Sequence, residues 1–463
     1  MRRGEVNNRC DVHFFNPIFV NARHDLLSSK LDIISLADLT KKPGQIQNFG
    51  AYSLCNFITF VDSGIPYIKV ENYNEHGINW DSIQYITPDI HDLLVKSKVR
   101  YGDILLSMAG TIGIATVFDK HLEANSNQAI AKIRLNDDRI TPAFLADFLN
   151  CRLGYLQSLR ISNGGVQLNI NLGEIGTILV PLPSLDMQHT LVADMESART
   201  ARRAKLGQAD ELLKGIDGFV LEQLGLKLPK SDDRSVFSIK LGDTKKRLDA
   251  YSNHPRFRNL KDVLLNKLSA VELSTLAIEI FSGITPTAGG DAYIEDASGI
   301  PFVRSGEITP DGKVAENIEL LLKPEIHDGM MKRSQLKQGD LLIAIVGATI
   351  GSVGVYDRNT PANINQAIAG VRLNDKVLPE FICWYLKSSA GQAVLEFLKR
   401  PVARANINLE EVGQILVPVP EIGIQKKIIT EVEKRRVQAR TLREAAEGEW
   451  QSAKEKFEKA LLR

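Results

Sequence analysis

The sequence predicts an α+β protein of two similar globular domains, joined by two long antiparallel helices that pair as a coiled coil. Three observations lead to this prediction. A module occurs twice with its motifs in the same order, and a long amphipathic segment without proline follows each copy. In addition, 463 residues exceed what a single hydrophobic core accommodates.

The repeat is clearest in GDILLSMAGTIGIATVFDKHLEANSNQAIAKIRLND from Gly102 and GDLLIAIVGATIGSVGVYDRNTPANINQAIAGVRLND from Gly339. With one gap, 20 of 36 aligned positions are identical. Outside these stretches, GIP, NIN and ILVPLP or ILVPVP recur in the same order. The spacing between matching motifs drifts by a few residues, so we interpret the repeat as a duplicated fold with loop insertions rather than a short-period solenoid.

Each copy mixes short strands with an amphipathic helix. PYIKVEN and PFVRSGE follow a Gly-Ile-Pro turn, and DILLSMAG, DLLIAIVG, AIAKIRL and AIAGVRL are apolar runs of strand length. PAFLADFLNCRL and PEFICWYLKSS begin with proline, which suits the first turn of a helix. Each copy is therefore predicted to be an α+β globule.

The segments 185–226 and 421–463 contain no proline, and their apolar residues recur every three or four positions. Such long helices must bury their apolar stripes, and each is the obvious partner of the other. We therefore divide the chain into a globular domain (1–184), a spacer helix (185–227), a linker (228–246), a second globular domain (247–420) and a second spacer helix (421–463).

Composition excludes some classes of protein. No apolar run is long enough to span a membrane, and the first residues lack the pattern of a secretory signal. Four cysteines without a CxxC pair suit the reducing cytoplasm, where we expect the protein to be. A formal net charge of +1 does not exclude nucleic-acid binding, because local basic clusters such as RTARRAK and KRPVAR can suffice.

Motifs for catalysis are weak. The Walker A and HExxH patterns are absent, and the histidines show no metal-ligand spacing. FNPIF from Phe15 resembles the Asn-Pro-Pro-aromatic loop of amino-methyltransferases, but Ile18 replaces the second proline, so a turn with a buried aromatic is favoured. Asp103 and Asp340 lack the acidic-x-Lys partner of a nuclease and fit turn chemistry. Recognition is therefore favoured over catalysis.

Taken together, these motifs resemble the specificity subunit of type I restriction–modification enzymes. The resemblance covers essentially the whole chain and rests on GDILLSMAGTIG and GDLLIAIVGATIG, the two NQAIA segments and RLND twice. ILVPLPSLDMQ and ILVPVPEIGIQ also match, with Gln188 or Gln425 at the start of a long helix.

The resemblance implies that each globule is a target recognition domain that reads one half of a bipartite, asymmetric site in double-stranded DNA. It implies that the helices set the gap between half-sites and dock two modification (methyltransferase) subunits. The modification subunits would bind S-adenosylmethionine, and restriction/translocase subunits would bind ATP and Mg. The chain itself would be non-catalytic.

Bases are read by side chains with paired donors or acceptors, such as Arg for guanine and Asn or Gln for adenine. We predict such contacts in the polar segment after each Gly-Ile-Pro, which differs between the copies, and in the loops SNGGVQ and RPVAR. The predicted DNA-binding residues are Lys69, Asn72, Tyr73, Asn74, Ser162, Asn163, Gln167, Arg304, Ser305, Glu307, Arg400 and Arg404. Identical residues cannot explain different preferences, so a structural role is predicted for Asn127, Gln128, Asn365 and Gln366.

Two alternatives remain open at this point. One is an enzyme, either a stand-alone DNA methyltransferase or a nuclease. The other is a protein–protein adaptor whose helical rod holds two identical partners.

Overall fold

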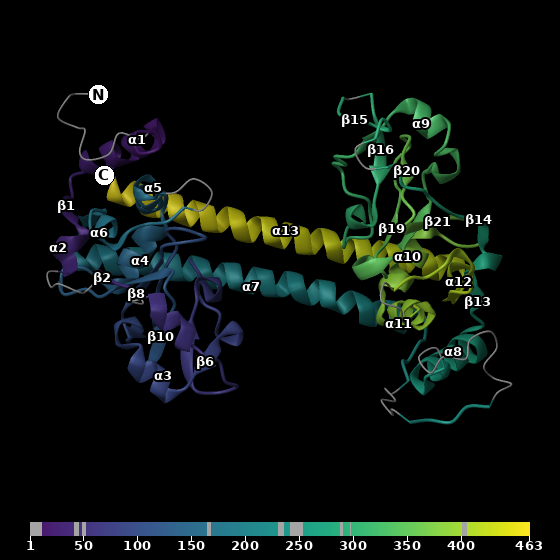
Figure 1. Ribbon diagram of the computed structural model, residues 1–463, viewed down its shortest axis with the longest axis horizontal. Helices are drawn as coiled ribbons and strands as arrows, with labels where there is room; N and C mark the ends of the chain where they lie inside the picture. Colours follow the sequence, from purple (N-terminus) through teal and green to yellow (C-terminus); the bar gives the residue numbers. More distant parts are fainter. Residues whose placement is uncertain are drawn as a thin grey trace. The chain divides into compact units, whose positions relative to one another are not determined.

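The computed structural model describes residues 12–40, 46–48, 52–163, 168–229, 236–240, 253–287, 290–296, 298–400 and 405–463. The chain divides into two compact units. Unit 1 comprises Met1–Gly207 and Leu442–Arg463, and unit 2 comprises Gln208–Thr441. Each unit holds one copy of the repeat and a part of both long helices, as the labels in Figure 1 allow the reader to follow.

The long helices are α7 (Leu185–Gln223) and α13 (Ile422–Leu461), and both are continuous. Within unit 1, Arg199 lies over the ring of Trp450 and Arg202 pairs with Glu447 at 3.3 Å. Within unit 2, Arg435 donates a hydrogen bond of 2.7 Å to the carbonyl of Gly215. Residue numbers rise along one helix as they fall along the other, so the predicted antiparallel pairing is confirmed.

The ends of α7 follow from local chemistry. At its start, the carbonyl of Ser184 accepts from the backbone N–H of Gln188 at 2.9 Å, and its hydroxyl accepts from that of Met187 at 3.3 Å. The helix ends at Gln223, short of the predicted residue 227. It ends there because Gly225 adopts a left-handed φ of 63° and closes the last turn.

In its described residues, unit 1 contains two four-stranded sheets, a two-stranded sheet and a hairpin. Apart from the parallel pair β3–β10, neighbouring strands are antiparallel. The sheets are β6 (Gln84–Ile86)–β3 (Ile65–Ile68)–β10 (Ala124–Ser126)–β7 (Lys98–Val99), β2 (Ile46–Gln47)–β11 (Ile130–Ile133)–β8 (Ile104–Ser107)–β9 (Ala115–Val117), β1 (Asp32–Ser35)–β12 (Leu179–Leu182) and the hairpin β4 (Tyr73–Asn74)–β5 (Gly77–Ile78). Its helices are α1 (Pro17–Leu27), α2 (Leu36–Thr40), α3 (Pro88–Leu93), α4 (Pro142–Asn150), α5 (Arg152–Ile161) and α6 (Leu172–Ile175).

The described part of unit 2 repeats most of this plan, again with a parallel pair, β16–β20, but without a counterpart of the hairpin β4–β5. Its sheets are β14 (Ala277–Ser282)–β21 (Ile368–Leu373)–β18 (Leu341–Ala344)–β19 (Val353–Val355), β15 (Tyr293–Ile294)–β17 (Leu321–Leu322)–β16 (Ile300–Val303)–β20 (Asn363–Ile364) and β13 (Val271–Glu272)–β22 (Leu416–Val417). Its helices are α8 (Pro255–Leu268), α9 (Pro324–Asp328), α10 (Pro379–Lys387), α11 (Ser389–Leu398) and α12 (Leu409–Gly413).

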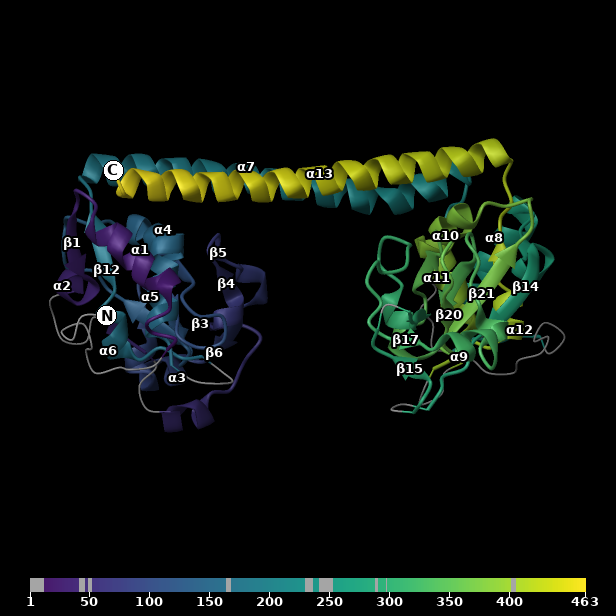
Figure 2. The same cartoon turned by 90° about the horizontal axis from the view of Figure 1, so that it is seen from above.

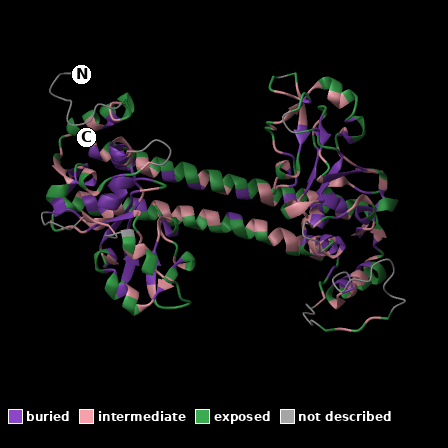
Figure 3. Cartoon of the chain, in the orientation of Figure 1, coloured by how far each residue is buried: buried purple, intermediate pink, exposed green. Residues whose placement is uncertain are grey.

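Both units build their core from the repeat together with the long helices. In unit 1, Trp450, Phe457 and Leu461 of α13 are buried with the apolar residues of α4 and α5. In unit 2, Val220 of α7 and Val432 of α13 are buried with those of α10 and α11. Figure 3 shows this burial in the sheets and inner helices, while the solvent faces are exposed. Figure 2 shows α4 next to the long helices within unit 1.

Several motifs shared by the two copies prove to be structural. Asp103 of the first GD accepts two hydrogen bonds from Arg134 of RLND, at 2.7 and 2.6 Å. Asp340 and Arg372 form the same pair at 3.0 and 2.8 Å. Each aspartate also accepts a hydrogen bond from the backbone N–H three residues before it, so both carboxylates are occupied inside their domains.

The glutamines at the starts of the long helices are fully buried anchors. The side-chain oxygen of Gln188 accepts from the backbone N–H of Thr141, and that of Gln425 accepts from Leu378, both at 2.9 Å. Each long helix is thereby tied to the start of the helix that follows β11 or β21, which is α4 or α10.

FNPIF and its counterpart NHPRF start helices α1 and α8. Asn16 and His254 cap these helices, each proline is the first helical residue, and the aromatic residues Phe19 and Phe257 are buried. The aromatic residue is buried as expected, but the motif forms the start of a helix rather than a separate turn. No helix in the described part of the chain is long and apolar enough to cross a membrane.

Candidate nucleic-acid interface

Each unit has a surface groove at the same place in its copy of the repeat. The first groove, in unit 1, has a volume of about 720 Å³, and the second groove, in unit 2, of about 560 Å³. Both are walled by the segment after the Gly-Ile-Pro strand, by the loop after β8 or β18, and by the NQA segment. The first is lined by Val70, Glu71, Tyr73, Asn74, Glu75, His76, Ala109, Gly110, Thr111, Ile114, Asn127, Ala129 and Arg202, and the second by Arg304, Ser305, Gly306, Glu307, Val346, Asn365, Gln366 and Ala367.

The segments after the Gly-Ile-Pro strands have the same local shape in both units. Each begins a 3₁₀ turn, at Val70 and at Ser305. The side chain of Asn72 accepts from the backbone N–H of Lys69 at 2.8 Å, and Glu307 accepts from that of Arg304 at 2.5 Å. Asn72 is buried, and its amide also donates to Ser82. Asn72 therefore shapes the segment rather than facing solvent.

In the first groove, the predicted residues differ in how available they are. Asn74 is exposed, and its side-chain oxygen accepts from the backbone N–H of His76. Tyr73 is buried beneath the groove, and burial raises the pKa of its hydroxyl. Lys69 donates to Gln84 at 2.5 Å and does not itself line the groove, although the segment that it starts does.

In the second groove, Arg304 is the most available charged donor among the predicted residues. Half of its side chain is exposed, and it pairs with Glu307 at 2.7 Å. This hydrogen-bonded pair raises the pKa of Arg304, so the guanidinium carries its charge at any physiological pH. The hydroxyl of Ser305 accepts from Thr349 at 3.0 Å and joins the segment to the loop after β18.

The loops SNGGVQ and RPVAR begin next to the grooves. Asn163 and Arg400 occupy equivalent positions, because each forms a β-bridge with the first asparagine of the NIN segment in its unit. The same asparagine forms a second β-bridge with a residue of the groove wall, Ala109 or Val346. Their side chains are held by Glu174 and Glu411. Ser162 is buried and donates to a carbonyl of α5. Gln167 and Arg404 lie outside the described residues.

Other groove residues escaped the sequence prediction. Asn127 and Asn365 line the grooves, but their side-chain oxygens also accept from the backbone N–H two residues later, at 3.2 and 3.1 Å. They combine the predicted structural role with a place in the wall. Arg202 of α7 lines the first groove. The basic cluster RTARRAK, which contains Arg202, was a signal of this in the sequence, although the helix that carries it was predicted to be a spacer.

Beneath the hairpin β4–β5, Asp147 of α4 is buried and pairs with Arg199 of α7. Burial raises the pKa of Asp147 to about 6, while the charge of Arg199 opposes this rise. The carboxylates of Glu196 and Glu75 add to it. An aspartate whose pKa is higher in the folded than in the unfolded state favours folding more as the pH falls.

We predict the pH dependence that follows. In Asp147→Asn the group cannot ionise. Relative to this variant, the wild type should therefore lose unfolding free energy as the pH rises from about 4 to about 7, on the order of 3 kcal/mol, and change no further above that. Hydrogen exchange of α4 amides at a series of pH values measures it. If the unfolding free energies of the two proteins changed with pH in parallel, the pKa of Asp147 would be unshifted.

A duplicated module on paired antiparallel helices, with matched grooves that carry different side chains, defines a two-site recognition protein. The family model for the type I restriction modification DNA specificity domain matches residues 50–199 and 279–434, which is more than half of the chain. The chain therefore belongs to this family, and the resemblance seen in the sequence is confirmed.

Two relatives illustrate the likeness. The type I restriction enzyme EcoBI specificity subunit of Escherichia coli is 28% identical over 340 residues, which cover 72% of this chain and 66% of that protein, just under two thirds of its length. A solved chain from a study of complex assembly and conformational transition of the type I R-M system is 16% identical. It covers 94% of this chain and 97% of its own length with a TM-score of 0.56, so it shares the fold.

Proposed function

We propose that this chain is the DNA-recognition subunit of a type I restriction–modification complex. Each unit reads one half of a bipartite, asymmetric site in double-stranded DNA. The observation that carries the proposal is the pair of grooves, which are built from the same elements but lined by different side chains. Two grooves built from the same backbone elements but lined by different hydrogen-bond donors and acceptors suit a protein that recognises two half-sites of different sequence.

The proposal extends to partners and cofactors. The long helices set the gap between the half-sites and dock two modification subunits, which carry S-adenosylmethionine and methylate adenine. Restriction/translocase subunits carry ATP and Mg, and this chain itself performs no chemistry. The complex works in the cytoplasm, whose reducing conditions suit free cysteines such as Cys151 and Cys383. Support comes from the family and from the identity of the Escherichia coli relative as a specificity subunit of a type I restriction enzyme.

Methylome sequencing of cells with and without the gene tests this function. We expect one bipartite adenine-methylation motif to disappear with the gene. The purified chain alone should methylate no DNA, and its DNA binding should weaken steeply with salt because phosphate contacts release counterions. Methylation by the chain alone would favour the stand-alone methyltransferase, and absence of DNA binding at any salt would favour the protein–protein adaptor.

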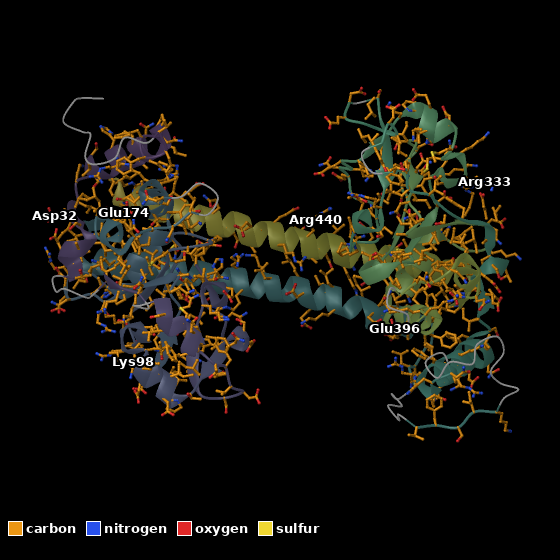
Figure 4. All side chains as sticks on the ribbon, viewed as in Figure 1. Asp32, Lys98, Glu174, Arg333, Glu396 and Arg440 are labelled. Carbon is orange, nitrogen blue, oxygen red and sulfur yellow. The ribbon has the colours of Figure 1, made fainter. Side chains whose placement is uncertain are left out.

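The proposed contacts include every predicted residue that lines a groove, and Arg304 gives the sharpest test. Arg304→Ala should weaken binding by about 1–3 kcal/mol at the half-site read by unit 2, and relax its sequence preference there only. Binding to duplexes with either half-site altered measures this. The matched control is Arg333→Ala, which removes an exposed arginine of unit 2 that does not line the second groove (Figure 4). Equal losses at both half-sites would contradict the assignment.

A further inference from the structure

Arg199 of α7 and Arg436 of α13 occupy the same position in the two long helices. Each lies at the same spacing after the buried glutamine that starts its helix, and each pairs with a glutamate three residues earlier, Glu196 or Glu433. Although arginine is normally exposed, only 13% and 16% of these side chains are accessible. Both copies of the repeat have therefore kept an arginine that faces inward.

In unit 1, Arg199 joins three elements. Its Nη2 donates to the carboxylate of Asp147 on α4, and its Nε donates to the backbone carbonyl of Glu75 at 3.4 Å. Its guanidinium also lies 5.4 Å from the ring centre of Trp450 on α13. The contact with Glu75 is made to the turn between β4 and β5, whose residues form one wall of the first groove.

The same hairpin is held from α13 as well. The carboxylate of Glu75 accepts from the indole N–H of Trp450 at 2.9 Å and from Lys454 at 3.2 Å. The ring of His76 packs edge-on against Trp450 at 4.8 Å. A hairpin with two-residue strands is not stable by itself. Its position is therefore determined by the helices to which it is fastened.

In unit 2, Arg436 makes the equivalent contact with different chemistry. Its Nη2 donates to Asp311 at 2.9 Å, and its guanidinium lies 5.3 Å from the ring centre of Trp384. Trp384 occupies on α10 the place that Asp147 occupies on α4. Asp311 lies in a tight turn between Ile308 and Val314, directly after the segment that lines the second groove. The acidic partner of the arginine thus lies on helix α4 in unit 1 and in a turn in unit 2, while the arginine occupies the same helix position in both units.

We propose that Arg199 and Arg436 are positioning residues. Arg199 fixes the β4–β5 hairpin, whose turn lines the first groove, to α7, and Arg436 fixes the turn between Ile308 and Val314, which directly follows the segment lining the second groove, to α13. The inference rests on the proposed function. Recognition requires donors and acceptors to be held within about 0.5 Å of their targets, so a unit whose hairpin or turn is loosened reads its half-site poorly. Because each arginine acts within its own unit, each governs one half-site.

The test uses the full chain in its complex with modification subunits, and duplexes in which each base pair of each half-site is altered. In Arg199→Ala, discrimination between correct and altered bases should fall about tenfold at the half-site of unit 1 and stay unchanged at the other, since one mismatch is typically worth a factor of this size. In Arg436→Ala the pattern should be reversed. The slope of affinity with salt should not change, because neither arginine is a phosphate contact.

Two controls separate positioning from loss of charge or fold. Arg203→Ala and Lys434→Ala remove exposed positive charges from the same helices and should change nothing. Arg436→Asp combined with Asp311→Arg restores the pair with its charges exchanged and should recover discrimination. Arg199→Lys keeps the charge but cannot reach both acceptors with a planar fork, so it should fold normally and still lose discrimination at one half-site.

Each result is decisive. Equal losses at both half-sites, unchanged discrimination, or a salt slope reduced by about one would overturn the positioning role, the last by revealing a phosphate contact. If the wild-type complex shows no bipartite preference, the proposed function itself fails. If the wild type reads a bipartite site but the variants do not separate its halves, only this inference fails.

Discussion

Trp450→Ala is expected to destabilise unit 1 by about 3–5 kcal/mol, although Trp450 lies far along the sequence from the repeat that it supports. Its side chain is 1% exposed and belongs to the core formed by α4 and α5. Its indole N–H also donates to Glu75, so the substitution removes apolar packing and leaves a carboxylate with one partner fewer. Loss of a buried aromatic side chain is among the most costly single changes in a protein.

Hydrogen exchange resolved along the chain measures this result. Amides of α4, α5 and β8 should exchange faster in the variant, while those of α10 and β18 in unit 2 should keep their wild-type rates. Gln451→Ala changes the neighbouring exposed position of α13 and serves as the matched control. Unchanged protection in α4 would show that the end of α13 contributes little to unit 1.

Asp340→Asn is expected to destabilise unit 2 by about 3–4 kcal/mol. The carboxylate is 1% exposed and accepts two hydrogen bonds from Arg372 and one from the backbone N–H of Lys337. Removing its charge leaves the guanidinium, which is 21% exposed, with Glu279 as its one remaining counterion among the described residues. Breaking one side of a buried ion pair is costly because the other charge stays desolvated.

Urea unfolding followed by hydrogen exchange of β18 and β21 checks this prediction. The control is Asp357→Asn, which breaks an ion pair with Lys313 in the same unit whose side chains are 41% and 50% exposed, and which should cost less than about 1 kcal/mol. Similar losses for the two variants would mean that the pair with Arg372 is no stronger than a surface pair. Asp103→Asn should repeat the result in unit 1.

Much of the fold could be predicted because it depends on the order of apolar, polar and proline residues within short segments of the sequence. The proline-free helices, the apolar strands and the duplicated order of motifs all depend on neighbours in sequence. The early end of α7 was missed although its cause, Gly225, is visible in the sequence. The contact of Trp450 with Glu75 could not be predicted, because no periodicity in either segment specifies a partner on the other.

The candidate site was predicted in part. The segments after the Gly-Ile-Pro strands do line the grooves, and Asn74, Arg304 and Ser305 are among the lining residues. Asn72 was chosen as a polar side chain that could read a base, but it is buried and caps its own turn. Glu307, three residues after Arg304, accepts from a backbone N–H in the same way, so the structure shows this position to be a cap in both copies.

The division of the chain has a consequence for its biosynthesis. Residues 208–441 of unit 2 are contiguous, whereas unit 1 requires residues 442–463, which are synthesised after all of unit 2. The module encoded first therefore completes its core last, and the usual order of folding during translation, from the amino terminus onward, is reversed. Until residues 442–463 have been synthesised, the apolar faces of α4 and α5 that pack against α13 stay uncovered and are a natural substrate for chaperones.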